Sequence, residues 1–218
     1  MLKKMYYLFY RLISPAGERG EYSGGYWQRR VRQEALTLLD DLDRGRVIEV
    51  GCGEGFFLSQ LAAKNSHLEI WGVDNNADRL KKAEERCRDK KVNLSLQDAS
   101  ALLFDSDFFD AIVCINVFFN MDSLKSIELA LKEMKRSCKN TGRIIFEFRN
   151  SANPLLKIKY KLARYYDGTV RDLHLNTYDP AQIEEILNNL DLIVTRKKFI
   201  GFPVPRIAPV IMIEAKKR

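Results

Sequence analysis

Short apolar runs alternate with longer amphipathic stretches along most of this chain. The runs with the length and β-branched content of buried strands are residues 46–50, 68–73, 92–96, 109–117 and 143–148. The stretches with apolar side chains at helical spacing are residues 27–42, 55–64, 77–88 and 123–139. Strands that alternate with helices predict βαβ units, a parallel sheet and right-handed crossovers.

The pattern changes after Pro154. Residues 154–166 form a helix-like segment that mixes basic and aromatic side chains. A second helix is expected from Asp179, a capping residue followed by Pro180 and Gln182, to about Leu190. The runs 192–199 and 210–215 are joined by a short loop, which favours an antiparallel pair at one end of the sheet. The expected fold is α/β, a doubly wound, seven-stranded and mostly parallel sheet with an antiparallel last strand pair and helices on both faces.

Charge and cysteine content narrow the function classes only partly. The formal net charge of +7 permits a nucleic acid, an anionic membrane surface or an acidic substrate, and a merely basic solvated surface is an equal alternative. The four cysteines form no C-x-x-C pair and there are two histidines, so we expect no metal site. Apolar surroundings for Cys52 and Cys114 suit free thiols in a reducing cytoplasm.

A glycine turn, VIEVGCGEGFF, is the strongest chemical signal. The strand at 46–50 runs directly into Gly51, Gly53 and Gly55, and a helix follows. Glycines there allow a sharp turn and close approach of the backbone to a ligand, and the helix offers free N–H groups. Any tight strand-to-helix turn can use glycine, so the turn alone does not define the ligand.

Two aspartates follow the next two strands. Asp74 comes 23 residues after Gly51, a spacing that predicts an acceptor for ribose hydroxyls, although it could instead cap the helix that follows. Asp98 is placed to accept from an exocyclic amine, or simply to form a turn. Phe56 stands where a dinucleotide fingerprint needs glycine, and Glu49 before the turn would repel a pyrophosphate. Electrostatics therefore favours a ligand that carries an ammonium and a sulfonium.

These segments resemble the class I S-adenosylmethionine-dependent methyltransferases, especially those that act on small molecules. The resemblance covers residues 22–216 and implies a Rossmann-like fold with S-adenosylmethionine as cofactor and S-adenosylhomocysteine as product. With no repeat or linker that would divide the chain, we expect one domain over 1–218, with an N-terminal lid or helix (1–25), a cofactor-binding core (26–150), an acceptor-side insertion (151–180) and a last helix and strand pair (181–218).

The resemblance also implies the residues around each part of the cofactor. VIEVGCGEG would surround the methionine part, WGVDNNADRL the ribose and adenine, LQDAS the adenine, and FDAIVCINVFFNM the methyl end, while GYWQRR would place a tyrosine over the cofactor. The cofactor-binding residues expected on this basis are Tyr26, Glu49, Gly51, Cys52, Gly53, Gly55, Asp74, Asn75, Asp98, Ala99, Asn116 and Val117.

No general base is evident, because Asn120 stands where many relatives carry histidine or glutamate. Asn120 and His174 are weak catalytic candidates. We expect direct in-line methyl transfer to a small, hydrophobic or lipid-like acceptor, with an RNA or protein methyltransferase, or a non-catalytic cofactor-binding protein, as alternatives. The N/D-P-P-Y/F signature of nucleobase methylation is absent, which makes nucleic acid a poor partner. We expect a cytoplasmic protein with peripheral membrane contact through residues 1–13, a basic and apolar segment too short to span a bilayer.

Overall fold

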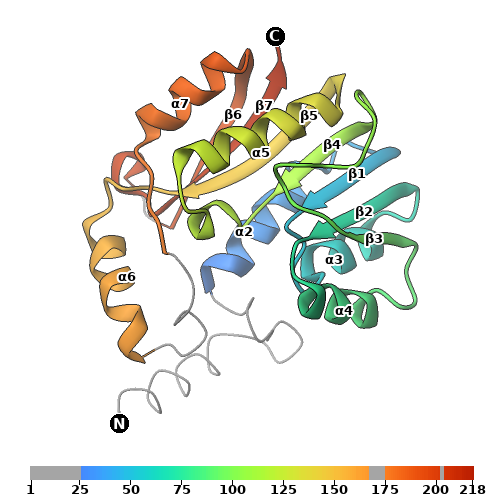
Figure 1. The fold of residues 1–218 in the computed structure, drawn as a ribbon, viewed down its shortest axis with the longest axis horizontal. Helices are drawn as coiled ribbons and strands as arrows, with labels where there is room; N and C mark the ends of the chain where they lie inside the picture. The colour runs from blue at the N-terminus through green and yellow to red at the C-terminus, as the bar shows by residue number, and fades with distance from the viewer. Residues whose placement is uncertain (1–25, 167–174, 202–203) are drawn as a thin grey trace.

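A single twisted sheet forms the centre of the protein (Figure 1). The structure is a computed structural model and describes residues 26–166, 175–201 and 204–218. The sheet has seven strands in the order β3-β2-β1-β4-β5-β7-β6. The strands are β1 (Gly45–Val50), β2 (Leu68–Asp74), β3 (Val92–Leu96), β4 (Phe109–Cys114), β5 (Cys138–Arg149), β6 (Leu192–Ile200) and β7 (Val210–Lys217).

The direction of the strands confirms the expected fold class. The pairs β1–β2, β1–β4, β2–β3 and β4–β5 are parallel. Strand β7 is antiparallel to both of its neighbours, β5 and β6. The last strand in sequence therefore inserts between β5 and β6, and β6 forms the edge of the sheet.

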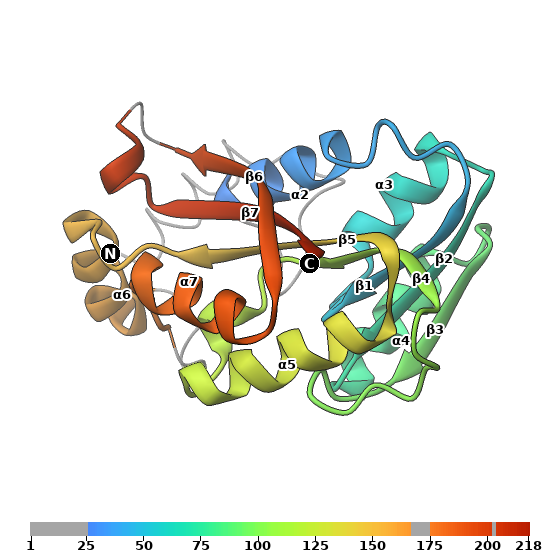
Figure 2. The ribbon, with the colours of Figure 1, turned by 90° about the horizontal axis from the view of Figure 1, so that it is seen from above.

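Helices cover both faces of the sheet (Figure 2). One face packs against α2 and α3 around Val31, Leu58 and Val113, and the other packs against α5 and α7 around Leu131 and Ile183. The helices are α2 (Tyr26–Thr37), α3 (Phe56–Lys64), α4 (Ala77–Arg86), α5 (Leu124–Ser137), α6 (Pro154–Tyr166) and α7 (Pro180–Asn189).

The segment after β4 differs from the sequence-based expectation. We expected a strand over 109–117, but β4 ends at Cys114. Asn116 has a φ of 58°, a left-handed conformation that ends the pleat, and a 3-10 turn, η2 (Phe118–Asn120), follows. The amphipathic stretch 123–139 likewise ends earlier, at Ser137, because β5 already begins at Cys138.

The strand order reverses between β1 and β4. From β1 the chain proceeds to β2 and β3 on one side, whereas β4 and β5 lie on the other side. At such a reversal the connections leave in opposite directions and open a crevice beyond the carboxyl ends of the strands, where open α/β sheets bind their ligands. The segments that border this position are the turn after Val50 and the loop after Cys114.

Candidate functional site

The glycine turn after β1 is held against the end of β2. The backbone N–H groups of Gly51 and Cys52 both donate to the carbonyl of Val73, at 2.8 and 2.9 Å. Gly51, Gly53 and Gly55 have φ angles of 77°, 52° and 74°, all in the left-handed region that favours glycine. The three glycines are thus required by the path of the backbone itself.

Two of these glycines also allow close packing. A Cβ atom on Gly51 would lie 2.3 Å from Cγ2 of Val117, so the loop after β4 packs directly on the turn. A Cβ atom on Gly55 would lie 3.0 Å from Cβ of Ala83 in α4. Gly51 therefore brings the β1 and β4 ends together, whereas Gly55 serves the packing of α3 on α4.

Glu49, the residue before Val50, is a buried carboxylate. It is 4% exposed, and its Oε2 atom has no hydrogen-bond partner among the residues that the structure describes. Burial raises the pKa of Glu49 well above its ordinary value; the charge of Arg32 opposes this shift and the charge of Asp74 adds to it. A buried acid with an unsatisfied oxygen and a second acid nearby favours a cationic group in its vicinity.

Asp74 lies at the end of β2 with both carboxylate oxygens directed at the backbone. Its Oδ2 accepts from the N–H of Gly53 at 2.8 Å, and its Oδ1 accepts from the N–H of Asn76 at 2.9 Å. Asn76 caps α4 by accepting from the N–H of Arg79 at 3.0 Å, so the capping role considered for Asp74 belongs to Asn76. An ionised carboxylate offers about four acceptor sites, so two remain for hydroxyl donors.

The carboxylate of Asp98 stabilises a turn, the structural role that the sequence allows as an alternative to ligand binding. Its Oδ1 accepts from the N–H of Ser100 at 2.8 Å and from its hydroxyl at 2.5 Å. Hydrogen bonds from Ser100, and a further one from Asn75, lower the pKa of Asp98. Asn75 and Asp98 are exposed, and the half-buried Ala99 packs on the core beside them. The β2 and β3 ends are therefore joined by side chains at a solvent-facing position.

Asn116 is fixed from two sides by charged residues of β5. Its N–H donates to Oε1 of Glu147 at 2.8 Å, and its Oδ1 accepts from Nη2 of Arg149 at 3.0 Å. Glu147 and Arg149 are 0% and 4% exposed and form an ion pair of 3.0 Å. Burial raises the pKa of Glu147 against the opposing charge of Arg149. This clamp holds the left-handed residue at the end of β4.

The clamp continues into α6 and η2. Tyr160 of α6 forms a side-chain hydrogen bond with Arg149, and the Arg149 guanidinium lies 4.9 Å from the centre of the Phe119 ring. Sequence reasoning missed Glu147 and Arg149. The available signal was a pair of opposite charges two residues apart in an apolar strand, which places both on one face of the sheet.

Of the two catalytic candidates, Asn120 lies in the described part of the chain, in the turn after β4. Asn120 ends η2, and its buried Oδ1 atom makes no hydrogen bond to the described part of the chain. The segment before α7 covers this turn, because Tyr178 Oη lies 2.8 Å from the carbonyl of Met121 and 3.0 Å from that of Phe118. His174 lies outside the described residues, as does the side chain of Tyr26 at the start of α2.

Phe56 occupies the position of the last fingerprint glycine. It is 5% exposed, and the Arg86 guanidinium lies 3.5 Å from the centre of its ring. The large side chain fills the space that close helix–strand packing requires in a dinucleotide site. In the described ranges, 26–166, 175–201 and 204–218, no group of three or more His, Cys, Asp or Glu could hold a metal ion.

Comparison with known proteins identifies the family of this chain. A family described as a methyltransferase domain matches residues 42–198. Demethylmenaquinone methyltransferase from Thermotoga maritima is 27% identical over 154 residues, which cover 71% of this chain and 59% of that protein. Cyclopropane-fatty-acyl-phospholipid synthase from Escherichia coli is 33% identical over 120 residues, which cover 51% of this chain and 30% of that protein. The matched regions thus span about a third to three fifths of these relatives.

A solved methyltransferase structure has the same fold as this chain. Magnesium protoporphyrin IX methyltransferase from Synechocystis PCC 6803, solved with bound S-adenosylhomocysteine, superposes with a TM-score of 0.71 at 16% identity and covers 100% of this chain and 96% of that one. The family match spans most of the chain, and the sheet order and glycine turn agree with it. The chain belongs to the class I S-adenosylmethionine-dependent methyltransferases.

Proposed function

We propose that this protein binds S-adenosylmethionine at the β1–β4 reversal and transfers its methyl group to a small, hydrophobic or lipid-like acceptor. The observation that carries the proposal is the buried Oε2 atom of Glu49 beside the glycine turn, which has no hydrogen-bond partner among the described residues. The cofactor combines an ammonium, a sulfonium and a ribose diol. Cationic groups suit Glu49, and the free acceptor sites of Asp74 suit the hydroxyls.

The remaining cofactor contacts are proposed from the same geometry. Gly51, Cys52, Gly53 and Gly55 would border the methionine part, because their backbone forms the turn beside Glu49. Further residues assigned to the cofactor are Asn75, Asp98 and Ala99 at the adenine, Asn116 and Val117 at the methyl end, and Tyr26 over the cofactor. Support is strongest for Asn116 and Val117, which the clamp and Gly51 hold at the reversal point.

Methyl transfer requires the protein mainly to align the acceptor with the methyl group of the cofactor. When bound, the cofactor supplies an electrophilic methyl group on its sulfonium. The protein's own residues would bind and orient the two reactants, and well-oriented reactants can reach effective molarities of about 10⁵ M or more. Asn120 would position the acceptor by accepting a hydrogen bond at its Oδ1, which has no partner in the described part of the chain. An acceptor that is already nucleophilic needs no general base.

The relatives support an apolar acceptor. The names of two of them refer to a quinone and to a phospholipid-linked fatty acyl chain. None of the described helices is long and apolar enough to cross a bilayer. We extend the proposal to peripheral membrane contact through residues 1–13, which lie outside the described part of the chain.

Transfer of labelled methyl groups tests the acceptor class. Purified protein and methyl-labelled S-adenosylmethionine are incubated with lipid, RNA and protein fractions of a cell extract, and Asp74→Ala protein serves as the control. The proposal expects label in the lipid fraction. Label confined to RNA or protein would show that the proposed acceptor class is wrong. Cofactor binding without transfer to any fraction would favour a non-catalytic role.

A further inference from the structure

Helix α6 carries an apolar stripe on its exposed side. Leu155, Ile158 and Leu162 are 61%, 55% and 50% exposed. At about 100° per residue, these three positions fall within about 60° of one another around the helix axis. Exposed apolar side chains scattered singly are ordinary on a protein surface, but a continuous stripe on one helix is not.

The stripe faces away from the described part of the domain on which α6 packs. The other side of the helix packs on the domain. It does so through Leu156, which is 5% exposed, and Tyr160, which forms a hydrogen bond with Arg149. By the same helical rotation, Leu156 and Tyr160 each lie about 160° from Ile158 around the helix axis. Burial in the domain therefore accounts for one side of α6 and leaves the apolar stripe directed outward.

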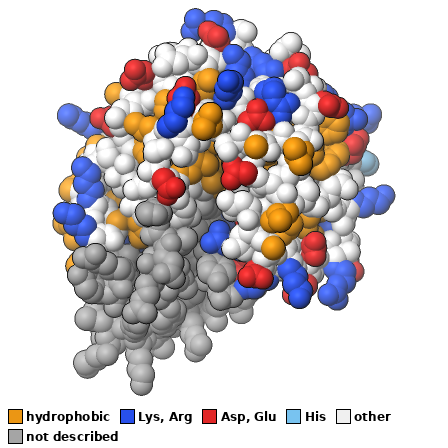
Figure 3. Space-filling view, in the orientation of Figure 1, with side chains coloured by type: hydrophobic (Ala, Val, Ile, Leu, Met, Phe, Trp, Pro, Cys, Tyr) orange, Lys and Arg blue, Asp and Glu red, His pale blue; other side chains and the backbone are white. Residues whose placement is uncertain are grey.

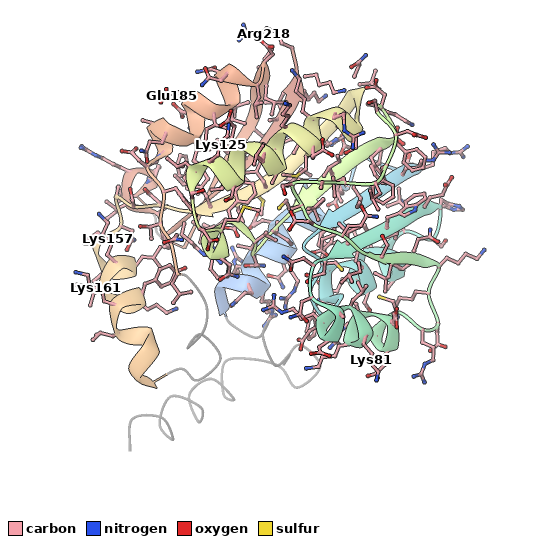
Figure 4. All side chains as sticks on the ribbon, in the orientation of Figure 1. Lys81, Lys125, Lys157, Lys161, Glu185 and Arg218 are labelled. Atoms are coloured by element: carbon pink, nitrogen blue, oxygen red, sulfur yellow. The ribbon has the colours of Figure 1, made fainter. Side chains whose placement is uncertain are left out.

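Lysines flank the stripe. Lys157, Lys159 and Lys161 are exposed, and residues 154–166 contain no acidic residue. Figure 4 shows Lys157 and Lys161 on the side of α6 that is turned away from the sheet. In the space-filling view, hydrophobic and basic side chains lie next to one another over α6 (Figure 3).

We propose that the outward face of α6 docks on an anionic bilayer surface. In this arrangement Leu155, Ile158 and Leu162 enter the boundary between headgroups and acyl chains, while Lys157 and Lys161 extend sideways to the lipid phosphates. Protein–protein interfaces are depleted in lysine, so a lysine-flanked apolar stripe fits a lipid surface better than a protein partner.

The docking face is coupled to the proposed site. Pro154 begins α6 five residues after Arg149, and Tyr160 connects the helix through Arg149 to Asn116 at the end of β4. A membrane-bound α6 would thus lie beside the carboxyl edge of the sheet, where an apolar acceptor can pass from the bilayer. The link to catalysis rests on the proposed function, whereas membrane docking itself does not.

Vesicle co-sedimentation tests the docking face. The full chain is mixed with phosphatidylcholine vesicles or with vesicles containing one quarter phosphatidylglycerol, and bound protein is measured after centrifugation. We expect preferential binding to the anionic vesicles and a loss of about tenfold or more in Leu155→Ser/Ile158→Ser/Leu162→Ser protein. Lys157→Gln/Lys161→Gln protein should lose several-fold in binding, and 0.5 M salt should weaken wild-type binding.

The matched control replaces three exposed apolar residues elsewhere, Leu103, Leu129 and Ile193, with serine, and it should bind vesicles like wild type. Binding by the α6 triple variant equal to wild type would overturn the proposal, as would wild-type protein that ignores both vesicle types. Wild-type dimers that the triple variant loses on gel filtration would assign the face to a second copy instead. Titration with S-adenosylhomocysteine in each variant separates a failure of docking from a failure of the proposed cofactor site.

Discussion

At the scale of single residues, the sequence was most informative where the backbone demands a residue type. Gly51, Gly53 and Gly55 were identifiable because a strand runs directly into a left-handed turn that favours glycine. The buried ion pair of Glu147 and Arg149 was not identifiable from the sequence. Its role depends on hydrogen bonds with Asn116, which is distant from both in sequence. The roles of the cofactor-binding residues stay predictions.

Asp74 and Asp98 should differ in their contribution to cofactor binding. Asp74→Ala removes a buried acceptor for two hydroxyls, and we expect cofactor binding to weaken by about 2–4 kcal/mol. Asp98 is exposed and already engaged by Ser100, so Asp98→Ala should cost about 1–2 kcal/mol. Calorimetric titration with S-adenosylhomocysteine measures both. An affinity of folded Asp74→Ala protein equal to that of wild type would remove Asp74 from the site.

Glu49 should make cofactor binding depend on pH. Its raised pKa means that the ligand-free protein keeps this proton above the ordinary carboxyl range, whereas a cationic ligand favours the carboxylate. Binding should therefore release a proton, and affinity should rise with pH up to the raised pKa. The free energy of unfolding of ligand-free protein should fall over the same window, because the folded state holds the proton more tightly.

Titration in buffers of different ionisation enthalpy detects this proton release. Glu49→Gln protein, which cannot ionise at this position, should bind the cofactor weakly and lack the Glu49 contribution to proton release. Equal affinity and equal proton release in wild type and Glu49→Gln would show that Glu49 does not meet the cationic part of the ligand.

The clamp should be vulnerable to removal of one partner. Arg149→Met leaves the carboxylate of Glu147 buried and unpaired, which should destabilise the protein by about 3–5 kcal/mol. Glu147→Gln/Arg149→Met removes both charges and keeps an acceptor for the N–H of Asn116, so it should be more stable than the single variant. Urea unfolding compares them. A double variant less stable than Arg149→Met would contradict the account of a coupled, buried ion pair.

At the scale of elements, strands and helices were predictable and the order of the last strands was not. Short apolar runs located all seven described strands. The runs of β1 and β4 are nearly continuous because the centre of a parallel sheet is buried on both faces. The insertion of β7 between β5 and β6 rests on long-range pairing that a local pattern does not record. The early end of β4 rests on Asn116, whose left-handed conformation depends on the charges of β5.

Helix α5 offers a matched test of the packing of its buried side. Leu131 is 0% exposed beneath the helix, whereas Leu129, on the same helix, is 40% exposed. Leu131→Ala should lower the free energy of unfolding by about 2–5 kcal/mol through lost burial and the cavity left behind. Leu129→Ala should change it by about 0.5 kcal/mol or less. Similar losses for both in urea unfolding would contradict the orientation of α5.

At the scale of the whole molecule, the proposed cofactor site and the basic helix α6 lie at the same edge of the sheet. The reversal between β1 and β4 brings a glycine turn, the buried acid Glu49 and the clamped Asn116 to one edge of the sheet. Helix α6 lies at the same edge (Figure 1). Its exposed residues include lysines and apolar side chains. If α6 docks on anionic lipid as proposed, the net charge of +7, ambiguous in the sequence, favours that contact.

Calorimetric titration of the wild-type protein with S-adenosylhomocysteine, with and without a chelator, tests the central claim most directly. The account predicts saturable binding of one equivalent that the chelator leaves unchanged and that Asp74→Ala and Glu49→Gln each weaken. Absence of binding by folded wild-type protein, or binding that both variants retain in full, would contradict a cofactor site at the β1–β4 reversal.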